Sequence, residues 1–445
     1  MANEESRQEQ GAESRPGPVP GEAIAGGVVA GSFGGNEANQ GGTALRVNTH
    51  VHVPPNFSAF ASPEEAVGLA VAQGIRVLGT ANYYDFRIYR RFEAAARSAS
   101  IVPLFGSEFH TVAEDLDGIR INDPSNPGQF NLCGKGLTQF DPPTESAACL
   151  IATMRDANAL RMRTMAERLA QHFTEAGVAG GPSYTQIKAT VARRSGVPEA
   201  WIALQERHLA EAFQELLFSS VPERDRPTVL DRLWGRQPAV DAADVVAVQE
   251  ALRSHLLKFG KPAFVPESEL TFEQAYRLVL DLGGIPCYPI FADAASSISE
   301  FEDPPEALVE RILDRRLYCA ELFPSRNRPE IVDRYVLALR GAGIIVVAGT
   351  DHNTKQMTPL SPTAGGEPLS LRARRAFWEG TCVVAAHQEL RTAGRPGYVD
   401  PTGALAAGFG DTETRIRWFA KAGEDAIETR TAVRAGHERV ESRGN

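Results

Sequence analysis

The chain has 445 residues, 43% of them hydrophobic, which is enough to fill the core of one large domain with an insertion, or of two or three domains. With 46 Lys and Arg against 56 Asp and Glu, the formal charge of −10 argues against nucleic acid as a bulk partner and against binding to an anionic membrane. The five cysteines are scattered and odd in number, and no apolar run is long enough to span a bilayer. We therefore expect a cytoplasmic protein with a small-molecule substrate. Homo-oligomer formation is left open.

Residues 1–43 are rich in Gly, Glu, Gln, Ser and Pro, a composition that predicts a disordered tail. The segment Leu45–Val53 then alternates apolar and polar residues, as a buried strand does. His50 and His52 lie two residues apart in it, so their imidazoles share a face on which they can bind one metal ion. The alternative is a pair of histidines that only pack or form hydrogen bonds at a strand end.

The next segments alternate between helix and strand. The first half has a helix opening at Ser62-Pro63, a strand at Ile75–Thr80, a helix to about Ser98 and a strand at Ile101–Phe109. After residue 260 the same rhythm returns, with strands expected at Ile285–Ile290, Leu317–Phe323 and Ile344–Gly349. This alternation predicts an α/β fold with a parallel sheet or barrel, whose site lies at the carboxyl ends of the strands.

Between these halves, from Glu145 to about Leu257, Leu, Ala, Met and Arg recur at helical spacing, which predicts a large, mostly helical insertion. The expected organisation is a disordered tail (1–43), the first part of the α/β domain (44–143), the insertion (144–260), the second part with C-terminal helices (261–425) and a polar tail (426–445).

Polar residues follow several of the expected strands. Imidazoles and carboxylates brought together by the strands of one sheet favour Zn, Mn or Fe over Ca. Helix caps, ion pairs and turns are the alternatives for each residue taken alone. The predicted ligands are His50, His52, Glu108, Asp351 and His352, and the predicted catalytic residues are His110 and Asp85. His110 can be a substitute ligand or a general acid, and the alternative is a hydrogen-bonded loop histidine.

A negatively charged substrate needs cations in its pocket, and three lie in loops expected after strands. Tyr83 can close the pocket over a ring or a sugar, or else pack at the rim. The predicted substrate-binding residues are Asn82, Tyr83, Lys135, Arg326 and Lys355. Solvated loop charges are the alternative for the three cations.

Five stretches, in chain order, resemble the PHP family, the polymerase and histidinol phosphatase domain of metal-dependent phosphoesterases. They are residues 46–52 (Arg-Val-Asn-Thr-His-Val-His), 62–65 (Ser-Pro-Glu-Glu), 105–108 (Phe-Gly-Ser-Glu), 282–286 (Leu-Gly-Gly-Ile-Pro) and 347–352 (Val-Ala-Gly-Thr-Asp-His). The resemblance covers most of residues 45–354 apart from the insertion. It implies a distorted (β/α)7 barrel with a metal cluster at the strand ends, and a phosphoesterase that uses a metal-bound water.

The chain departs from the family pattern where that pattern has metal ligands. Asn48 stands in place of the family's Asp, Asn82 ends its second motif, and Asn131 stands for a His. The resemblance therefore implies one or two divalent ions (Zn, Mn or Fe) rather than three. The leading hypothesis is a metal-dependent hydrolase acting on a small phosphorylated substrate. The alternatives are a metal-dependent sugar or polyol isomerase or lyase, and a catalytically degenerate binding protein.

Overall fold

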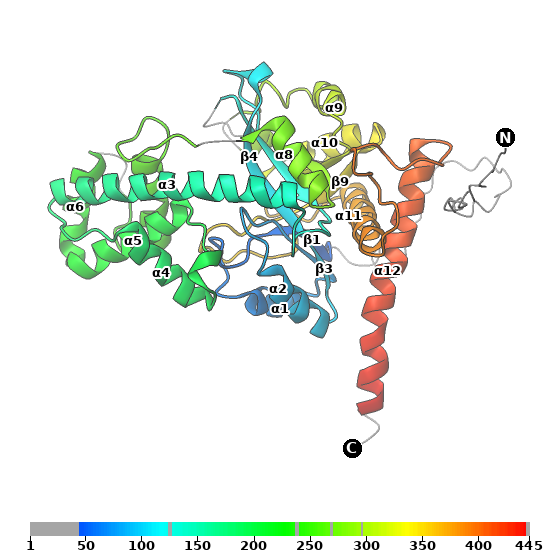
Figure 1. The fold of residues 1–445 in the computed structure, drawn as a ribbon, viewed down its shortest axis with the longest axis horizontal. Helices are drawn as coiled ribbons and strands as arrows, with labels where there is room; N and C mark the ends of the chain where they lie inside the picture. Colours follow the sequence, from blue (N-terminus) through cyan, green and yellow to red (C-terminus); the bar gives the residue numbers. More distant parts are fainter. Residues whose placement is uncertain (1–43, 123–126, 236–239, 268–269, 295–296, 442–445) are drawn as a thin grey trace, which may run out of the picture. The chain divides into compact units, whose positions relative to one another are not determined.

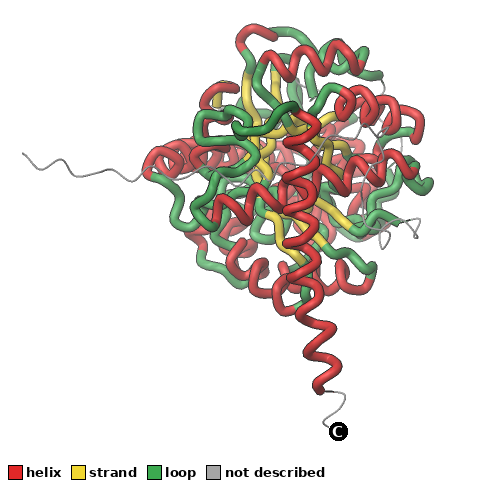
Figure 2. Tube along the Cα trace, turned by 90° about the vertical axis from the view of Figure 1, so that its right-hand side faces the viewer, coloured by secondary structure: helices red, strands yellow, loops and turns green. Residues whose placement is uncertain are grey.

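The computed structural model describes residues 44–122, 127–235, 240–267, 270–294 and 297–441. The tail predicted at residues 1–43 lies outside these ranges, as does the end of the one predicted at 426–445. In the described part the fold is mixed α/β, with mostly parallel strand pairs and many helices (Figure 1). In the view of Figure 2 the strands lie among surrounding helices and loops.

A three-stranded parallel sheet is formed by the first strands of the chain. Its order is β1-β2-β3, and its elements with the helices between them are β1 (Val47–Val51), α1 (Pro63–Ala72), β2 (Val77–Thr80), α2 (Tyr89–Ser98) and β3 (Val102–Leu104). Ser62 caps α1 by accepting a hydrogen bond from the Glu65 amide, and proline begins the helix, as the sequence predicts.

A second sheet has six strands in the order β6-β4-β5-β7-β8-β9. Its strands are β4 (Gly106–Val112), β5 (Gln129–Lys135), β6 (Leu270–Thr271), β7 (Ile285–Ile290), β8 (Cys319–Leu322) and β9 (Ile345–Ala348). Strand β5 runs antiparallel to both β4 and β7, and the other pairs are parallel. The single strand expected at Ile101–Phe109 is therefore divided into β3 and the start of β4, one in each sheet.

Two hydrogen-bonded sheets, rather than one closed barrel, are found within the described residues. They meet at a parallel bridge between Val51 and Asp351, where the His52 amide donates to the Asp351 carbonyl at 3.1 Å. At the other seam, Gly106 lies so close to β2 and β5 that a Cβ would stand 2.5 Å from the Thr80 carbonyl oxygen. Only glycine fits there, so the start of β4 can pass directly against the end of β2.

Helices occupy the stretch that the sequence predicts to be mostly helical. They are α3 (Glu145–Glu175), α4 (Tyr184–Ser195), α5 (Glu206–Ser220), α6 (Arg226–Trp234) and α7 (Val245–Leu252). Most of their buried apolar side chains form a cluster of their own, whereas Ala147 and Met154 at the start of α3 belong to the larger cluster around the sheets. In Figure 1 α3 runs from beside the sheets toward α4, α5 and α6.

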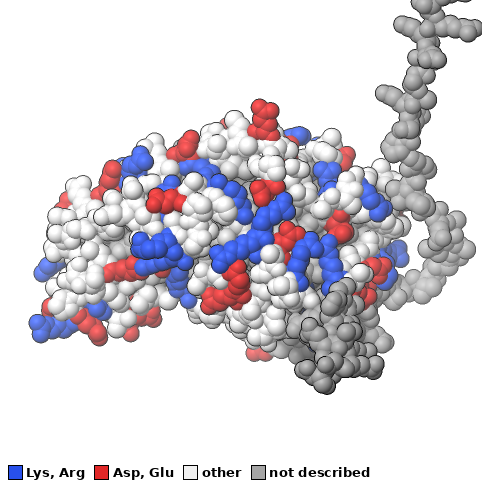
Figure 3. Space-filling model, turned by 60° about the horizontal axis from the view of Figure 1, so that its bottom comes forward, with Lys and Arg blue, Asp and Glu red and all other residues white. Residues whose placement is uncertain are grey.

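The remaining helices accompany the second sheet. They are α8 (Phe272–Asp281), α9 (Pro305–Asp314), α10 (Pro329–Gly341), α11 (Leu371–Thr392) and α12 (Thr412–Glu441). None of the helices in the described ranges is both long and apolar enough to cross a bilayer. On the face drawn in Figure 3, basic and acidic side chains are interspersed.

Candidate metal centre

Strand β1 brings two imidazoles together. His50 lies in β1 and His52 just after it, and both are fully buried. Residues two apart in an extended chain share a face, and the two ring centroids are accordingly 5.2 Å apart. The rings are supported from the sides, because His52 stacks on Tyr83 and His50 meets Phe323 edge to face.

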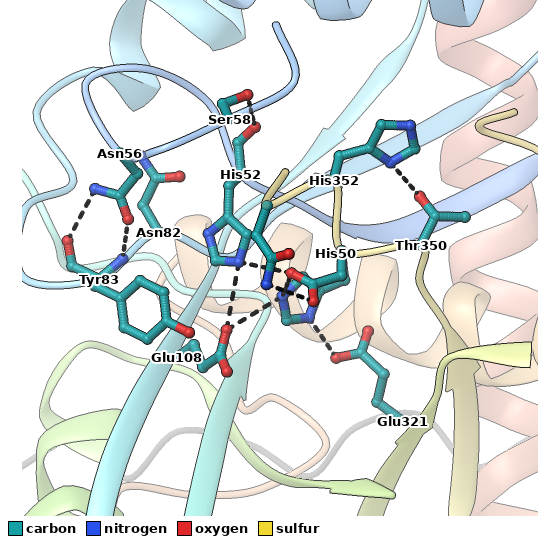
Figure 4. A network of polar contacts seen from close by, with 12 residues as sticks. His50, His52, Asn56, Ser58, Asn82, Tyr83, Glu108, Glu321, Thr350 and His352 are labelled. Carbon is teal, nitrogen blue, oxygen red and sulfur yellow. Dashed lines mark hydrogen bonds and ion pairs between the residues drawn. The ribbon is translucent and has the colours of Figure 1, made fainter. Parts of the chain in front are cut away.

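Two carboxylates from other strands converge on these rings. Glu108 is in β4, and Asp351 follows β9 at the seam between the sheets. The distance from Glu108 Oε2 is 3.5 Å to His50 Nε2 and 3.4 Å to His52 Nε2 (Figure 4). Asp351 Oδ1 lies 3.9 and 3.0 Å from the same two nitrogens. We call these four residues the ligand cluster. Ligands about 2.0–2.2 Å from one ion have donor atoms separated by about 3–4 Å, as here.

The chemistry of the donor atoms also fits a divalent cation. His50 Nε2, His52 Nε2 and Asp351 Oδ1 are buried and form no hydrogen bond of good geometry within the described residues. Buried polar atoms without such bonds are costly, and a bound ion is one explanation for them. The four residues each offer one ligand atom, and these atoms lie within 4.8 Å of one another.

The charges within the ligand cluster shift the pKa values of its residues in the direction opposite to the effect of burial. Burial alone would raise the pKa of Glu108 and of Asp351, but the histidines, together with Arg326 beside Asp351, hold both pKa values below their usual range. Burial alone would lower the pKa of His50 and of His52, and the neighbouring carboxylates raise both instead. The carboxylates are therefore ionised, as metal ligands must be.

The backbone and two neighbours fix the orientation of Asp351. Its φ of +70° is rare for a residue other than glycine. Arg326 Nη2 donates to Asp351 Oδ2 at 2.5 Å, and Asn353 Nδ2 donates to the same oxygen at 2.7 Å. Because Oδ2 is engaged in this way, Oδ1 is the oxygen that faces the histidines.

His352, predicted as a fifth ligand, lies outside the ligand cluster. It too has a positive φ, 49°, and its ring turns away from His50 and His52 (Figure 4). Its Nδ1 lies 2.7 Å from Thr350 Oγ1 and its Nε2 lies 2.9 Å from the Thr358 carbonyl oxygen. Both ring nitrogens are thus engaged in hydrogen bonds within the loop.

Asp85 and Asn82, predicted as catalytic and substrate-binding, have structural partners instead. Asp85 is paired with Arg87 and with Arg155 of α3, and it does not line the cavity beside the ligand cluster. The Asn82 side chain is buried and bonded to both the amide and the carbonyl of Val53. These two residues hold the loop after β2 in place.

The predicted cations are found in three different environments. Arg326 lines the cavity next to Asp351. Lys135 is not in a loop, as the sequence suggested, but is the last residue of β5, where only 2% of its side chain is exposed. Lys355 lies 3.4 Å from Glu211 and above the Phe57 ring, and it is not part of the cavity lining. Of the three, Arg326 alone has the position expected for a substrate contact.

A cavity of about 1000 Å³ opens beside the ligand cluster. Glu108, Asp351, Tyr83 and His110 form part of its wall, and other parts come from the helical stretch and from residues in and after β4, β5, β7 and β8. His110 is 3.0 Å from Glu267 and meets Tyr83 edge to face. Tyr83 is buried, which together with Glu108 and Asp351 holds its pKa well above the usual range, so the phenol stays protonated.

The helical side of the wall carries a second group of charges, which sequence reasoning did not single out as a site. We call it the ion-pair cluster, and it comprises Arg161, Glu206, Arg253, Lys258 and Glu267. Burial raises the pKa of Glu206 and the three cations lower it, with a net result of about 2, and Glu267 likewise has a pKa of about 2. Helical periodicity does not reveal where a helix docks, so the sequence offered no signal for this cluster.

Glu321 is the other residue that sequence reasoning missed. It lies in β8, is fully buried and accepts a hydrogen bond from His50 Nδ1 at 2.7 Å. The available signal was an acidic residue in the middle of an otherwise apolar strand, Cys-Ala-Glu-Leu-Phe. A carboxylate in such a position requires partners.

Comparison with known proteins gives a fold but no family. No model of a protein family matches the sequence, and no curated protein matches it. Among solved structures, a proposed metal-dependent phosphoesterase from Bifidobacterium adolescentis is 16% identical, with a TM-score of 0.51 over 75% of this chain and 96% of that one. An amidohydrolase from Chromobacterium violaceum with bound sulfate and no metal is 17% identical, with a TM-score of 0.47 over 71% and 93%. At such identities the likeness to the first structure concerns the fold alone.

Proposed function

We propose that this protein is a metal-dependent hydrolase, and specifically a phosphoesterase acting on a small phosphorylated substrate. The observation that carries the proposal is the convergence of four donor atoms, from two imidazoles and two carboxylates, at one side of a large cavity. His50, His52, Glu108 and Asp351 would hold one divalent ion, with Zn, Mn or Fe favoured by this mixture of nitrogen and oxygen ligands. The fold shared with a proposed metal-dependent phosphoesterase is consistent with this reading.

A bound divalent ion would supply Lewis-acid chemistry, by activating water and stabilising charge on the phosphoryl oxygens. The protein's own contribution begins with Arg326, whose guanidinium lies on the cavity wall and holds Asp351 Oδ2. Its remaining N–H groups can donate to phosphoryl oxygens and orient the ester. Tyr83, stacked on His52, shields the ligand cluster from bulk water on one side.

His110 would act as the general acid. It lies on β4 two residues from Glu108, so both side chains share a face and both line the cavity. Glu267, 3.0 Å from His110 Nδ1, would accept a hydrogen bond from that nitrogen and stabilise the doubly protonated ring, whose second proton, on Nε2, would pass to the oxygen of the leaving group. Asp85 and Asn82 are assigned support of the loop rather than chemistry, because their side chains are engaged elsewhere.

The decisive experiment measures metal and activity together. Purified protein is expected to contain one Zn, Mn or Fe ion per chain by elemental analysis. It should hydrolyse members of a panel of phosphate monoesters and diesters, lose this activity in a chelator and regain it when the metal is restored. Absence of stoichiometric metal after incubation with each ion would overturn the proposal.

We propose further that the two sheets together form a distorted (β/α)7 barrel. The Val51–Asp351 bridge and the close approach of Gly106 to Thr80 support it, because they join the two sheets at both seams. Residues 144–260 would then be an insertion that forms the far wall of the cavity. An experimental structure in which the seams separate would refute this description.

A further inference from the structure

A buried chain of polar groups lies behind His50, on the side away from the cavity. Glu321 Oε2 is 2.7 Å from His50 Nδ1, and Glu321 Oε1 accepts from Thr49 Oγ1 at 2.8 Å. Lys135 Nζ lies 2.6 Å from Glu321 Oε1 and 3.1 Å from the Thr49 carbonyl oxygen. The side chains of His50 and Glu321 are 0% exposed and that of Lys135 is 2% exposed, so none of these contacts is screened by water.

The chain is assembled from three separate strands. His50 and Thr49 come from β1, Lys135 ends β5 and Glu321 is in β8. Taking a lysine and a glutamate out of water costs several kcal/mol for each ion before pairing. The buried pair is therefore weak evidence for a role in stability alone, and its contact with a candidate metal ligand suggests a different role.

Glu321 has a direct effect on the chemistry of the His50 ring. A carboxylate can only accept at this contact, so the proton of the imidazole is held on Nδ1. In the neutral ring the lone pair is then on Nε2, which lies on the side of Glu108 and Asp351, where the donor atoms converge. The ammonium of Lys135 supplies the countercharge for Glu321 and fixes the carboxylate in the plane that this requires.

We propose that Glu321 and Lys135 are positioning residues for the metal centre. They hold His50 as the Nδ1–H tautomer and fix its ring rotation, so that Nε2 is presented to the ion. This inference rests on the proposed metal centre of the preceding subsection. In carboxylate–histidine–metal arrangements of this type, removal of the carboxylate typically lowers metal affinity by about 10- to 100-fold.

The same geometry argues against an ion bound behind His50. A second group of donors, His50, Cys133 and Glu321, also lies within 4.8 Å. Lys135, however, already provides a cation in contact with Glu321, with its Nζ 2.6 Å from Glu321 Oε1, and the other carboxylate oxygen faces His50 Nδ1. Both oxygens of Glu321 thus have partners, and the ligand cluster is left as the place for the ion.

The test compares two buried glutamates. Glu321→Gln removes the charge behind His50, whereas Glu302→Gln changes an equally buried glutamate that accepts from Tyr288 and from backbone amides away from the cluster. We expect Zn²⁺ affinity, measured by competition with a chelating dye, to fall about 10- to 100-fold in Glu321→Gln. In Glu302→Gln it should stay at the wild-type value. The absorption spectrum of the Co²⁺-loaded protein should change in the first variant only.

Thr49→Val gives the same test without altering a buried charge, because it removes a hydroxyl that contacts Glu321 Oε1 and the Ala348 carbonyl oxygen. It should weaken Zn²⁺ binding in the same direction and by a smaller factor. Wild-type affinity and an unchanged Co²⁺ spectrum in both Glu321→Gln and Thr49→Val would overturn the proposal.

Long-range ¹H–¹⁵N spectra of the metal-free wild type separate this inference from the proposed function. A proton on Nδ1 of His50, with or without a second proton on Nε2, that is disturbed in Glu321→Gln is the expected result. If that signature is present but the wild type takes up no metal, the proposed hydrolase fails and the assignment of the tautomer stands. A proton on Nε2 alone overturns the inference whatever the metal content.

Discussion

Two polar clusters face the same cavity and are built in opposite ways. In the ion-pair cluster each carboxylate is matched by cations, with Arg161 serving both Glu206 and Glu267. In the ligand cluster, buried donor atoms of His50, His52 and Asp351 converge without hydrogen bonds of good geometry among the described residues. Because both clusters are buried and charged, neither property marks a site by itself. The two clusters differ in whether the described residues supply hydrogen-bond or ion-pair partners for the buried polar atoms. They do so in the ion-pair cluster and only in part in the ligand cluster.

The largest effect should come from His52→Ala, which removes a donor atom of the ligand cluster. If the ion contributes several kcal/mol to the transition state, kcat/KM should fall on the order of 1000-fold, and bound metal should be lost. The control is His387→Gln, since His387 is also buried but both its ring nitrogens have backbone partners, the Gly283 carbonyl and the Tyr398 amide. Equal loss of metal in both variants would contradict the comparison.

Removal of the metal should destabilise the wild type and leave the His52→Ala protein unaffected. An ion that binds only the folded state adds about 4 kcal/mol to the free energy of unfolding when its concentration is 1,000 times Kd. A chelator should therefore lower the free energy of unfolding, measured with urea, in the wild type and leave it unchanged in His52→Ala. A chelator effect of similar size in His52→Ala would mean that the ion binds somewhere else.

Acid should remove the contribution of the ion-pair cluster to the free energy of unfolding. The pKa of Glu206 is about 2 in the folded protein against a usual 4.5, a difference of about 2.5 pH units, equivalent to about 3 kcal/mol. Since the folded-state pKa is the lower one, this contribution is complete above pH 4.5 and is lost as the pH falls toward 2. Glu206→Gln should thus be less stable than the wild type at pH 7, with a gap in unfolding free energy that narrows through this window. A gap independent of pH would refute the explanation.

The smallest effect is expected from a single methyl group at Gly349. A Cβ there would stand 2.3 Å from His50 Cβ and 3.2 Å from Glu321 Oε1, so Gly349→Ala must displace His50. We expect Zn²⁺ affinity to fall on the order of tenfold and stability to fall by about 1–3 kcal/mol. Gly68→Ala, in α1, adds the same methyl with nothing within 4 Å and should leave metal binding unchanged. A wild-type Zn²⁺ affinity in Gly349→Ala would show that β9 does not constrain the ring.

The pattern of strands predicted which residues form the ligand cluster, but it did not predict the hydrogen bonds and ion pairs of the residues in the neighbouring loops. His50, His52 and Glu108 could be found because strand periodicity sets the face, and the carboxyl ends of neighbouring strands meet at one edge. His352 could not be judged in this way, because the positive φ values that turn its ring away belong to the loop and not to a repeating pattern. One of the two partners of Asp85 is Arg155, 70 residues away in a helix whose docking the sequence does not encode locally.

The general fold class was predictable, and the break between the sheets was not. Alternation of helix and strand indicated mixed α/β structure with parallel pairs, which the structure has. The division of Ile101–Phe109 into β3 and β4 depends on packing at Gly106, which is a tertiary effect. Lys135 was predicted to lie in a loop because the expected strand-like run ends at Cys133, whereas β5 continues to Lys135 and Glu321 makes its burial tolerable.

The separation of the two apolar cores bears on how this protein can change over evolution. The side chains that pack α3 to α7 together form their own cluster, while the candidate ligands are anchored in the strands. Mutations in the helices that line the cavity can therefore accumulate without displacing the candidate ligands, which the strands hold in position to bind the ion. Selectivity for new substrates could in this way be explored by one part of the chain while the reaction chemistry is inherited unchanged by the other.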